Sequence, residues 1–229
     1  MNERPKNKTL GDGFHKVVHT GLGSVPLVGT PLAALFETIF TPPIEKRKEK
    51  WLEDLAKVIT EIQERVDNLN PEALSQNEVF ISMVMKASLV AIRSHQEEKI
   101  SALRNALLNS VLPNSPNEDI QAIFLNLIDE FTPWHIRLLS LLNDPAGWMK
   151  NNNVKNPSWS MGGVSTVIEF CFSDLRGKKE FYRLLIRDLQ SAGLIVQGQI
   201  LGVTMSGSGM LASRTTDLGK QFLRYISKP

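Results

Sequence analysis

The sequence predicts a mainly α-helical protein in which a long antiparallel helical hairpin precedes a second helical domain with a small β-hairpin. Two observations predict this class. Apolar residues recur at three- and four-residue spacing through most of the chain, which is the period of amphipathic helices. Near the C-terminus a helical run stops at Gly193, and a glycine-rich polar segment separates it from a final capped helix.

The first 40 residues divide into a polar part and an uncharged part. Residues 1–19 are polar, and we expect a flexible N-terminus there. Residues 20–36 carry no charge, and this length is marginal against the roughly 20 apolar residues that span a bilayer. We expect a proline-broken loop followed by a helix over 31–40 that packs on the hairpin. Insertion into a membrane is the alternative. The apolar residues that would make either contact are Leu22, Val25, Leu27, Val28, Leu32, Leu35 and Phe36.

The helical hairpin follows and completes a first domain over residues 20–115. Pro42 and Pro43 predict the start of a helix of about 25 residues, because proline suits the first helical turn. A turn over residues 68–76 leads to a second long helix over 77–112. The apolar stripe of this helix is interrupted at residues 93–99, where we expect a wet end of the bundle. Two long helices joined by a short turn pack antiparallel.

The second domain is predicted over residues 116–229. Two prolines and small polar residues at 113–117 mark the boundary. We expect a loop over 144–160, a β-hairpin over 194–216 as the sole β-structure, and a last helix opened by Thr216 and Asp217. The other helices are predicted over residues 118–131, 134–142, 162–172 and 178–192. Three helices followed by a β-hairpin are the order of a winged helix, in which the hairpin is the wing.

The helix predicted over 178–192 stands where a winged helix has its recognition helix. Its inward stripe is predicted to be Phe181, Leu185, Leu189 and Ala192. Its outward face gathers three cations and an amide, which could contact phosphates and base edges. These candidate nucleic-acid or partner-binding residues are Lys179, Arg183, Arg187 and Gln190, joined by Arg214 from the wing.

Charge favours a protein partner over nucleic acid. The net charge of the chain is +2, and residues 158–229 hold nine Lys or Arg against five Asp or Glu, a local excess of +4 that is modest for phosphate binding. Glu180 and Asp188 lie near the cations, and the tip of the predicted wing carries no Lys or Arg. We therefore expect a non-enzymatic module for protein interaction or self-association. A DNA-binding transcriptional regulator and a membrane-active effector using residues 20–40 are the alternatives.

Residues 215–226, Thr-Thr-Asp-Leu-Gly-Lys-Gln-Phe-Leu-Arg-Tyr-Ile, resemble the close of many bacterial winged-helix proteins. Together with the hairpin ahead of them, the layout of the chain resembles the bacterial abortive-infection alpha-type family, whose members also end in a Leu-Gly-x-x-Phe helix. The close match covers about the last 15 residues. The resemblance implies a bacterial cytoplasmic protein linked to phage defence, without enzymatic activity, and it transfers no catalytic residue.

No motif predicts an enzyme, a cofactor, a metal or a small-molecule substrate. The glycines around Leu22 lack the Gly-Lys-Ser/Thr sequence of a phosphate loop. His15 and His19 have metal-ligand spacing, but no further His or Cys lies nearby in the sequence. The lone thiol, Cys171, cannot form an internal disulfide, and its two Phe neighbours predict a buried, inert side chain in a reducing cytoplasm.

Overall fold

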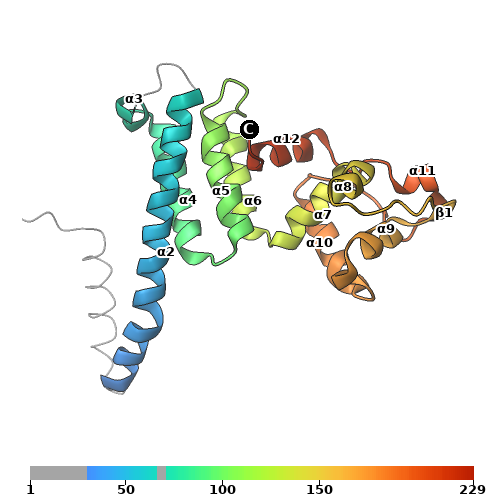
Figure 1. Cartoon of the computed structure of the whole chain (residues 1–229), viewed down its shortest axis with the longest axis horizontal. Coiled ribbons are helices and arrows are strands. Elements are labelled where there is room, and N and C mark those ends of the chain that lie inside the picture. Colours follow the sequence, from blue (N-terminus) through green and yellow to red (C-terminus); the bar gives the residue numbers. More distant parts are fainter. Residues whose placement is uncertain (1–29, 66–70) are drawn as a thin grey trace, which may run out of the picture. The chain divides into compact units, whose positions relative to one another are not determined.

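The computed structural model describes residues 30–65 and 71–229, with side chains described for residues 42–65 and 72–229. In these ranges the protein is mainly helical and has one small antiparallel sheet (Figure 1). The chain divides into two compact units that meet between Lys50 and Trp51. The described part of the first unit is the beginning of helix α2, and residues 51–229 form the second unit.

Helix α2 (Thr30–Arg65) begins well before the predicted start and runs through Pro42 and Pro43. That prediction was wrong because a proline inside a helix removes a donor and bends the helix without always ending it. The helix predicted over 31–40 is present as the first part of α2. The contacts of the apolar segment stay a prediction, because residues 20–29 and the side chains up to position 41 lie outside the described residues.

The predicted second long helix is two helices that pack on each other. After α3 (Pro71–Ser75), helix α4 (Glu78–Arg93) ends at Ser94, and α5 (Glu97–Ser110) begins after Gln96. The expectation of one continuous helix was therefore wrong. The polar residues 93–99 interrupt the stripe because the chain reverses there, and a stripe of the same period resumes on the far side of the turn.

Side-chain contacts join the second-unit part of α2 to α4 and α5. The Trp51 indole Nε1 donates a hydrogen bond of 2.8 Å to the Ser88 hydroxyl of α4. The buried Asp54 carboxylate lies 3.7 Å from the Arg104 guanidinium of α5. Burial of Val58 and Ile62 continues the same face of α2. One amphipathic face therefore holds this part of α2 against the helices that follow it.

Helix α6 (Glu118–Glu130) follows the predicted turn at 113–117 and packs on both α4 and α5. Asn117 caps it by accepting a hydrogen bond of 3.0 Å from the Ile120 amide. The buried Gln121 amide donates to the Ser115 hydroxyl and the Pro116 carbonyl, which satisfies it in the apolar interior. One hydrophobic core continues from α2 into α12 across the turn at 113–117, and the two-domain division stays a prediction.

Helices α2, α4, α5 and α6 form a bundle, and the chain continues from it into helix α7 (Pro133–Asn143). This helix has the predicted cap and proline start at Thr132 and Pro133. Helix α8 (Pro145–Asn151) occupies the first part of the predicted loop. The loop prediction overlooked its start signal, because Asp144 accepts a hydrogen bond of 2.9 Å from the Gly147 amide and a proline follows it. Helices α9 (Val164–Cys171) and α10 (Lys179–Ser191) follow, with a 3₁₀ turn over Ser173–Leu175 between them.

The β-structure extends beyond the predicted wing. At the two ends of the predicted hairpin, Ile195 and Thr215 form an isolated antiparallel bridge, and the hairpin itself stays a prediction. Strand β2 (Met205–Ser206), however, pairs with β1 (Met161–Gly162), which precedes α9 and lies outside residues 194–216. The sequence could not indicate β1, because two residues are too few to show strand alternation. A short helix, α11 (Gly207–Met210), follows β2.

Helix α12 (Asp217–Ile226) joins the C-terminal elements to the bundle, as Figure 1 shows. Thr216 caps it as predicted, since its hydroxyl accepts a hydrogen bond of 3.1 Å from the Gly219 amide. The buried Phe222 ring meets the Phe124 ring of α6 edge to face at 5.2 Å. The Tyr225 ring lies 5.4 Å from the same Phe124 ring. Two aromatic side chains thus fix α12 in the common core.

Candidate interaction surface on helix α10

Local signals define helix α10 and its inward face. Gly193 adopts φ +70°, a left-handed conformation that suits glycine, and the Leu194 amide returns to the Leu189 carbonyl at 3.0 Å. The buried residues of α10 are Tyr182, Leu185, Ile186 and Leu189, so Leu185 and Leu189 are buried as predicted, while Tyr182 and Ile186 replace Phe181 and the half-buried Ala192. Tyr182 is fully buried and donates a hydrogen bond of 2.7 Å to the Glu169 carboxylate, whereas Phe181 is 40% exposed. Placing Phe181 in the core was therefore wrong.

The three predicted cations on α10 share an exposed face. Lys179, Arg183 and Arg187 all lie on the solvent side of the helix. Arg183 forms an ion pair of 3.3 Å with Glu180, and Arg187 lies 3.7 Å from the Asp188 carboxylate. Since exposed pairs of this kind contribute little to stability, these side chains are available for contacts outside the chain.

The other two predicted site residues bind the chain itself. The Gln190 amide donates to the Val196 and Gly198 carbonyls at 3.0 and 2.7 Å, which ties α10 to the segment that follows it. The Arg214 guanidinium donates to the Gly209 carbonyl at 2.7 Å. The structure thus brings Lys179, Arg183 and Arg187 together and places Gln190 and Arg214 in internal contacts.

Exposed apolar side chains lie on the flank of α10 that faces α7. Phe181 is 40% exposed and Leu184, one turn further, is 43% exposed. Beside Phe181 is an open depression of about 520 Å³, lined by Trp134, Asp174, Leu175, Lys178 and Phe181. Sequence reasoning missed this surface because it placed Phe181 inward. We call Phe181, Leu184 and the lining of the depression the α7–α10 surface.

Aromatic packing holds the Trp134 wall of the α7–α10 surface in place. The Phe172 ring meets Trp134 edge to face at 5.4 Å, and Trp148 packs on Phe172 at 5.0 Å. The Arg137 guanidinium lies over the Trp134 ring at 5.1 Å and is also ion-paired with Glu98 of α5. The wall is therefore pre-organised, which lowers the entropic cost of binding against it.

His135 fastens α10 to α7 next to this surface. Its Nδ1 accepts a hydrogen bond of 3.0 Å from the Thr132 backbone amide, so Nε2 carries the proton of the neutral ring. Nε2 lies 3.4 Å from the Asp188 carboxylate of α10, and the ring stacks on Phe131 at 4.6 Å. Burial lowers the pKa of His135 below its ordinary value, although Asp188 acts in the opposite direction.

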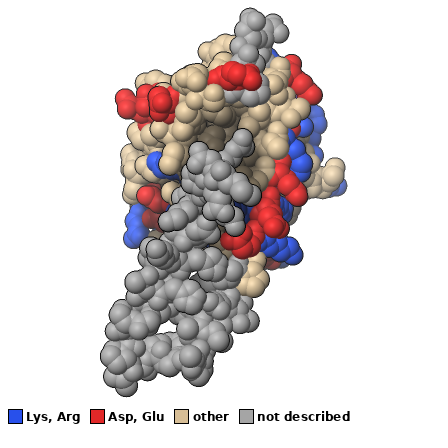
Figure 2. All heavy atoms as spheres, turned by 90° about the vertical axis from the view of Figure 1, so that its left-hand side faces the viewer, with Lys and Arg blue, Asp and Glu red and all other residues tan. Residues whose placement is uncertain are grey.

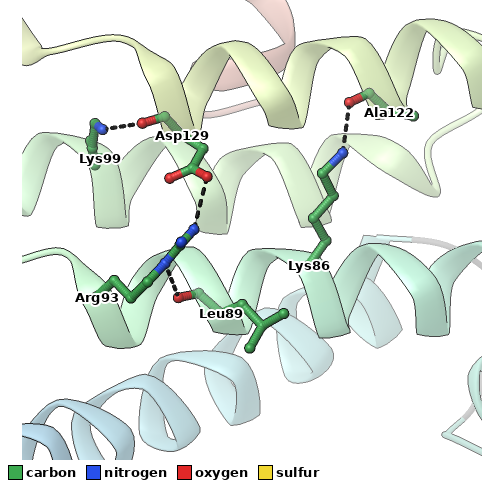
Figure 3. Close-up of polar contacts among 6 residues, drawn as sticks. All are labelled: Lys86, Leu89, Arg93, Lys99, Ala122 and Asp129. Carbon is green, nitrogen blue, oxygen red and sulfur yellow. Dashed lines mark hydrogen bonds and ion pairs between the residues drawn. The ribbon is translucent and has the colours of Figure 1, made fainter.

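A second group of cations lies on the bundle and is engaged by α6, as Figure 3 shows. Lys86 of α4 donates to the Ala122 carbonyl at 3.2 Å. Arg93 pairs with the Asp129 carboxylate at 2.8 Å, and Lys99 of α5 donates to the Asp129 carbonyl at 2.6 Å. Burial lowers the pKa of Lys99, with Asp129 opposing the shift. These contacts join α4 and α5 to α6. They account for the gathering of the three cations without a bound ligand.

Lys and Arg do not gather separately from Asp and Glu on the face of the molecule that Figure 2 draws. Figure 2 shows Lys and Arg interspersed with Asp and Glu on the side that faces the viewer. A face that binds nucleic acid through phosphates has a continuous basic patch, which the described residues of this view do not form.

Within the side chains that the structure describes, no three of His, Cys, Asp and Glu come together in a way that could hold a metal ion. Cys171 is half-buried, and burial raises the pKa of its thiol to about 11, which keeps it protonated and unreactive near neutral pH. No helix of the described ranges has both the length and the apolar character needed to cross a membrane.

Comparison of the chain with family models, with curated proteins and with solved structures gives no match. The geometry of the α7–α10 surface is therefore the basis for a functional conclusion.

Proposed function

We propose that the chain is a non-enzymatic interaction protein whose C-terminal elements form a winged-helix module that binds a protein partner. Helices α7, α9 and α10 would be its three helices, and residues 194–216 its wing. The antiparallel pairing of Ile195 with Thr215 supports the wing. The pairing of β1 with β2 adds a strand ahead of α9.

One observation carries the choice of a protein partner. Phe181 and Leu184 expose 40% and 43% of their surface on the helix that a DNA-binding winged helix would insert into a groove. Exposed aromatic and aliphatic residues beside arginine are characteristic of protein interfaces, whose energetic centres are rich in aromatic and Arg side chains.

Site-specific photo-crosslinking in cells that express the chain tests this proposal. A photoreactive amino acid replaces Leu184 in one variant and Ile123 in the control, because Ile123 is similarly exposed, at 50%, and lies on α6, outside the proposed module. We expect a discrete protein adduct from position 184 and none from position 123. Equal labelling at both positions, or none at 184, contradicts the proposal.

Nucleic-acid binding is the competing outcome, since Lys179, Arg183 and Arg187 share an exposed face. A salt-titrated binding assay on mixed DNA duplexes measures it. A steep loss of affinity with salt that becomes shallower in the Arg183→Ala, Arg187→Ala double variant assigns the module to DNA instead.

The proposed link to phage defence is supported by the resemblance of residues 215–226. Packing alone accounts for two residues of that motif. A Cβ atom at Gly219 would overlap the Leu194 carbonyl oxygen, and Phe222 is fully buried. The efficiency with which phages form plaques on cells with and without the chain tests the defence role, and equal efficiency contradicts it.

A further inference from the structure

We propose that residues 51–65 of α2 form a strap that detaches from α4 and α5 while the rest of the fold stays intact. The helical bundle then has a closed state, which the structure shows, and an open state. The proposal concerns the bundle and goes beyond the proposed function of the α7–α10 surface. Burial of Trp51, Val58 and Ile62 on the strap makes the closed state the predominant one.

An ion pair with long distances interrupts the apolar face of the strap. Asp54 is only 6% exposed. Its carboxylate lies 3.7 Å from the Arg104 guanidinium of α5 and 3.5 Å from the Lys57 ammonium, which is one turn further along the strap. Charge-assisted hydrogen bonds are shorter, at about 2.7–2.9 Å. The carboxylate therefore loses water in the closed state without gaining a close contact with either cation.

The Arg104 side of this contact is incompletely satisfied as well. Its Nε is buried and has no hydrogen-bond partner among the residues that the structure describes. Detachment of the strap lets water reach both the guanidinium and the carboxylate, which recovers their solvation. Because this desolvation cost is present only in the closed state, it lowers the free energy of opening. The ion pair therefore acts as a release point in an otherwise apolar contact.

Two other polar contacts of the strap can be broken at low cost. The Trp51 indole donates to the Ser88 hydroxyl, but that hydroxyl also donates to the Val84 carbonyl of its own helix at 2.6 Å and stays hydrogen-bonded without the strap. The Arg65 guanidinium donates to the Pro229 carbonyl at 3.3 Å at an exposed position, where water replaces the bond. The strap also begins the second unit, and elements at the edge of a compact unit open locally when few contacts hold them.

Native-state hydrogen exchange of the full chain at increasing urea concentrations, followed by NMR, tests the proposal. We expect the amides of residues 54–65 to exchange about tenfold or more faster than those of α6. Their exchange should also depend less on urea, because detachment of one helix exposes less surface than global unfolding.

Variants of the ion pair separate a release point from ordinary fraying of a helix. Arg104→Met lies on α5 and should speed exchange of the strap about tenfold, since it leaves the buried Asp54 carboxylate without its partner across the helices. The Asp54→Leu, Arg104→Met double variant should slow this exchange about tenfold relative to the parent chain, because an apolar pair is buried without the desolvation cost. Arg183→Met, at an exposed site of α10, is the control and should leave exchange of the strap unchanged.

Thr60→Leu, at an exposed site of the strap, controls for the higher helix propensity of leucine and should slow exchange about threefold at most. Circular dichroism spectra check first that all variants keep the parent fold. The proposal is overturned if the strap and α6 exchange at equal rates with equal urea dependence, because the bundle then opens as one unit. It is also overturned if the double variant exchanges as fast as the parent chain, since the ion pair then does not lower the free energy of opening.

Discussion

The Asn109 side-chain amide of α5 donates to the Tyr225 backbone carbonyl at 2.9 Å, near the end of α12. The same Asn109 amide nitrogen also donates to the Ser227 carbonyl at 2.8 Å. Asn105, one turn earlier on α5, donates to the Ile226 carbonyl at 2.9 Å. Carbonyls in the last turn of a helix have no partner within that helix. Two asparagines of the bundle therefore cap the helix that joins the C-terminal elements to it.

Asn109→Ala should lower the free energy of unfolding by about 1–2 kcal/mol, because partly buried carbonyls lose their donor. Asn109→Asp should cost more, since it also places a negative charge at the negative end of α12. Urea unfolding followed by circular dichroism measures both changes. Asn126→Ala, at an exposed site of α6, is the control. A loss no larger than that of the control means that the cap is not stabilising.

Acid should destabilise the fold through His135. Its folded-state pKa lies below the ordinary value of 6.5, so the unfolded chain binds more protons between the two values. The stability that the neutral His135 contributes is therefore fully present above about pH 6.5. It is lost as the pH falls from there through the lower pKa of the folded state.

His135→Gln removes this titration while keeping an acceptor for the Thr132 amide. Between about pH 7.5 and pH 5 the parent chain should lose more free energy of unfolding than the variant. His95→Gln, at an exposed site, controls for the loss of a histidine. Parallel pH profiles for the parent chain and His135→Gln are inconsistent with a buried neutral imidazole.

Gly219→Ala should destabilise the protein by about 1–3 kcal/mol. The added Cβ would overlap the Leu194 carbonyl oxygen and lie 2.6 Å from the Thr215 methyl group, in the segment that α12 covers. Thermal and urea unfolding measure the change. Lys220→Ala, at the next position and exposed, should change stability by less than about 0.5 kcal/mol. Equal stability of the two variants would contradict the close approach.

Arg214→Lys keeps the charge and loses the geometry of the guanidinium. Because Arg214 donates to the Gly209 carbonyl at 2.7 Å, we expect faster amide hydrogen exchange around α11 and a stability loss of about 1 kcal/mol. Mass spectrometry of exchanged peptides locates the effect, and Arg224→Lys, at an exposed position of α12, is the control. Unchanged protection around α11 would mean that the Arg214 hydrogen bond does not hold this segment in place.

The sequence by itself determined the helical class and most helix ends. Thr132 with Pro133, Asn117, Gly193 and Thr216 act through atoms a few residues away, so a local reading locates them. The same local signal at Asp144 and Pro145 was present and was overlooked. Helical periodicity also marked α4 and α5 as amphipathic, although it could not show that the chain turns back between them.

Only the tertiary structure decided which polar and aromatic side chains face outward. Phe181 and Tyr182 are adjacent aromatics at the edge of one stripe, and the position of α9 buries Tyr182 against Glu169 while Phe181 stays exposed. Gln190 and Arg214 look like surface ligands in the sequence, yet they donate hydrogen bonds to the backbone carbonyls of Val196 and Gly209. These outcomes depend on contacts between segments that only packing brings together, which the period of a single helix does not encode.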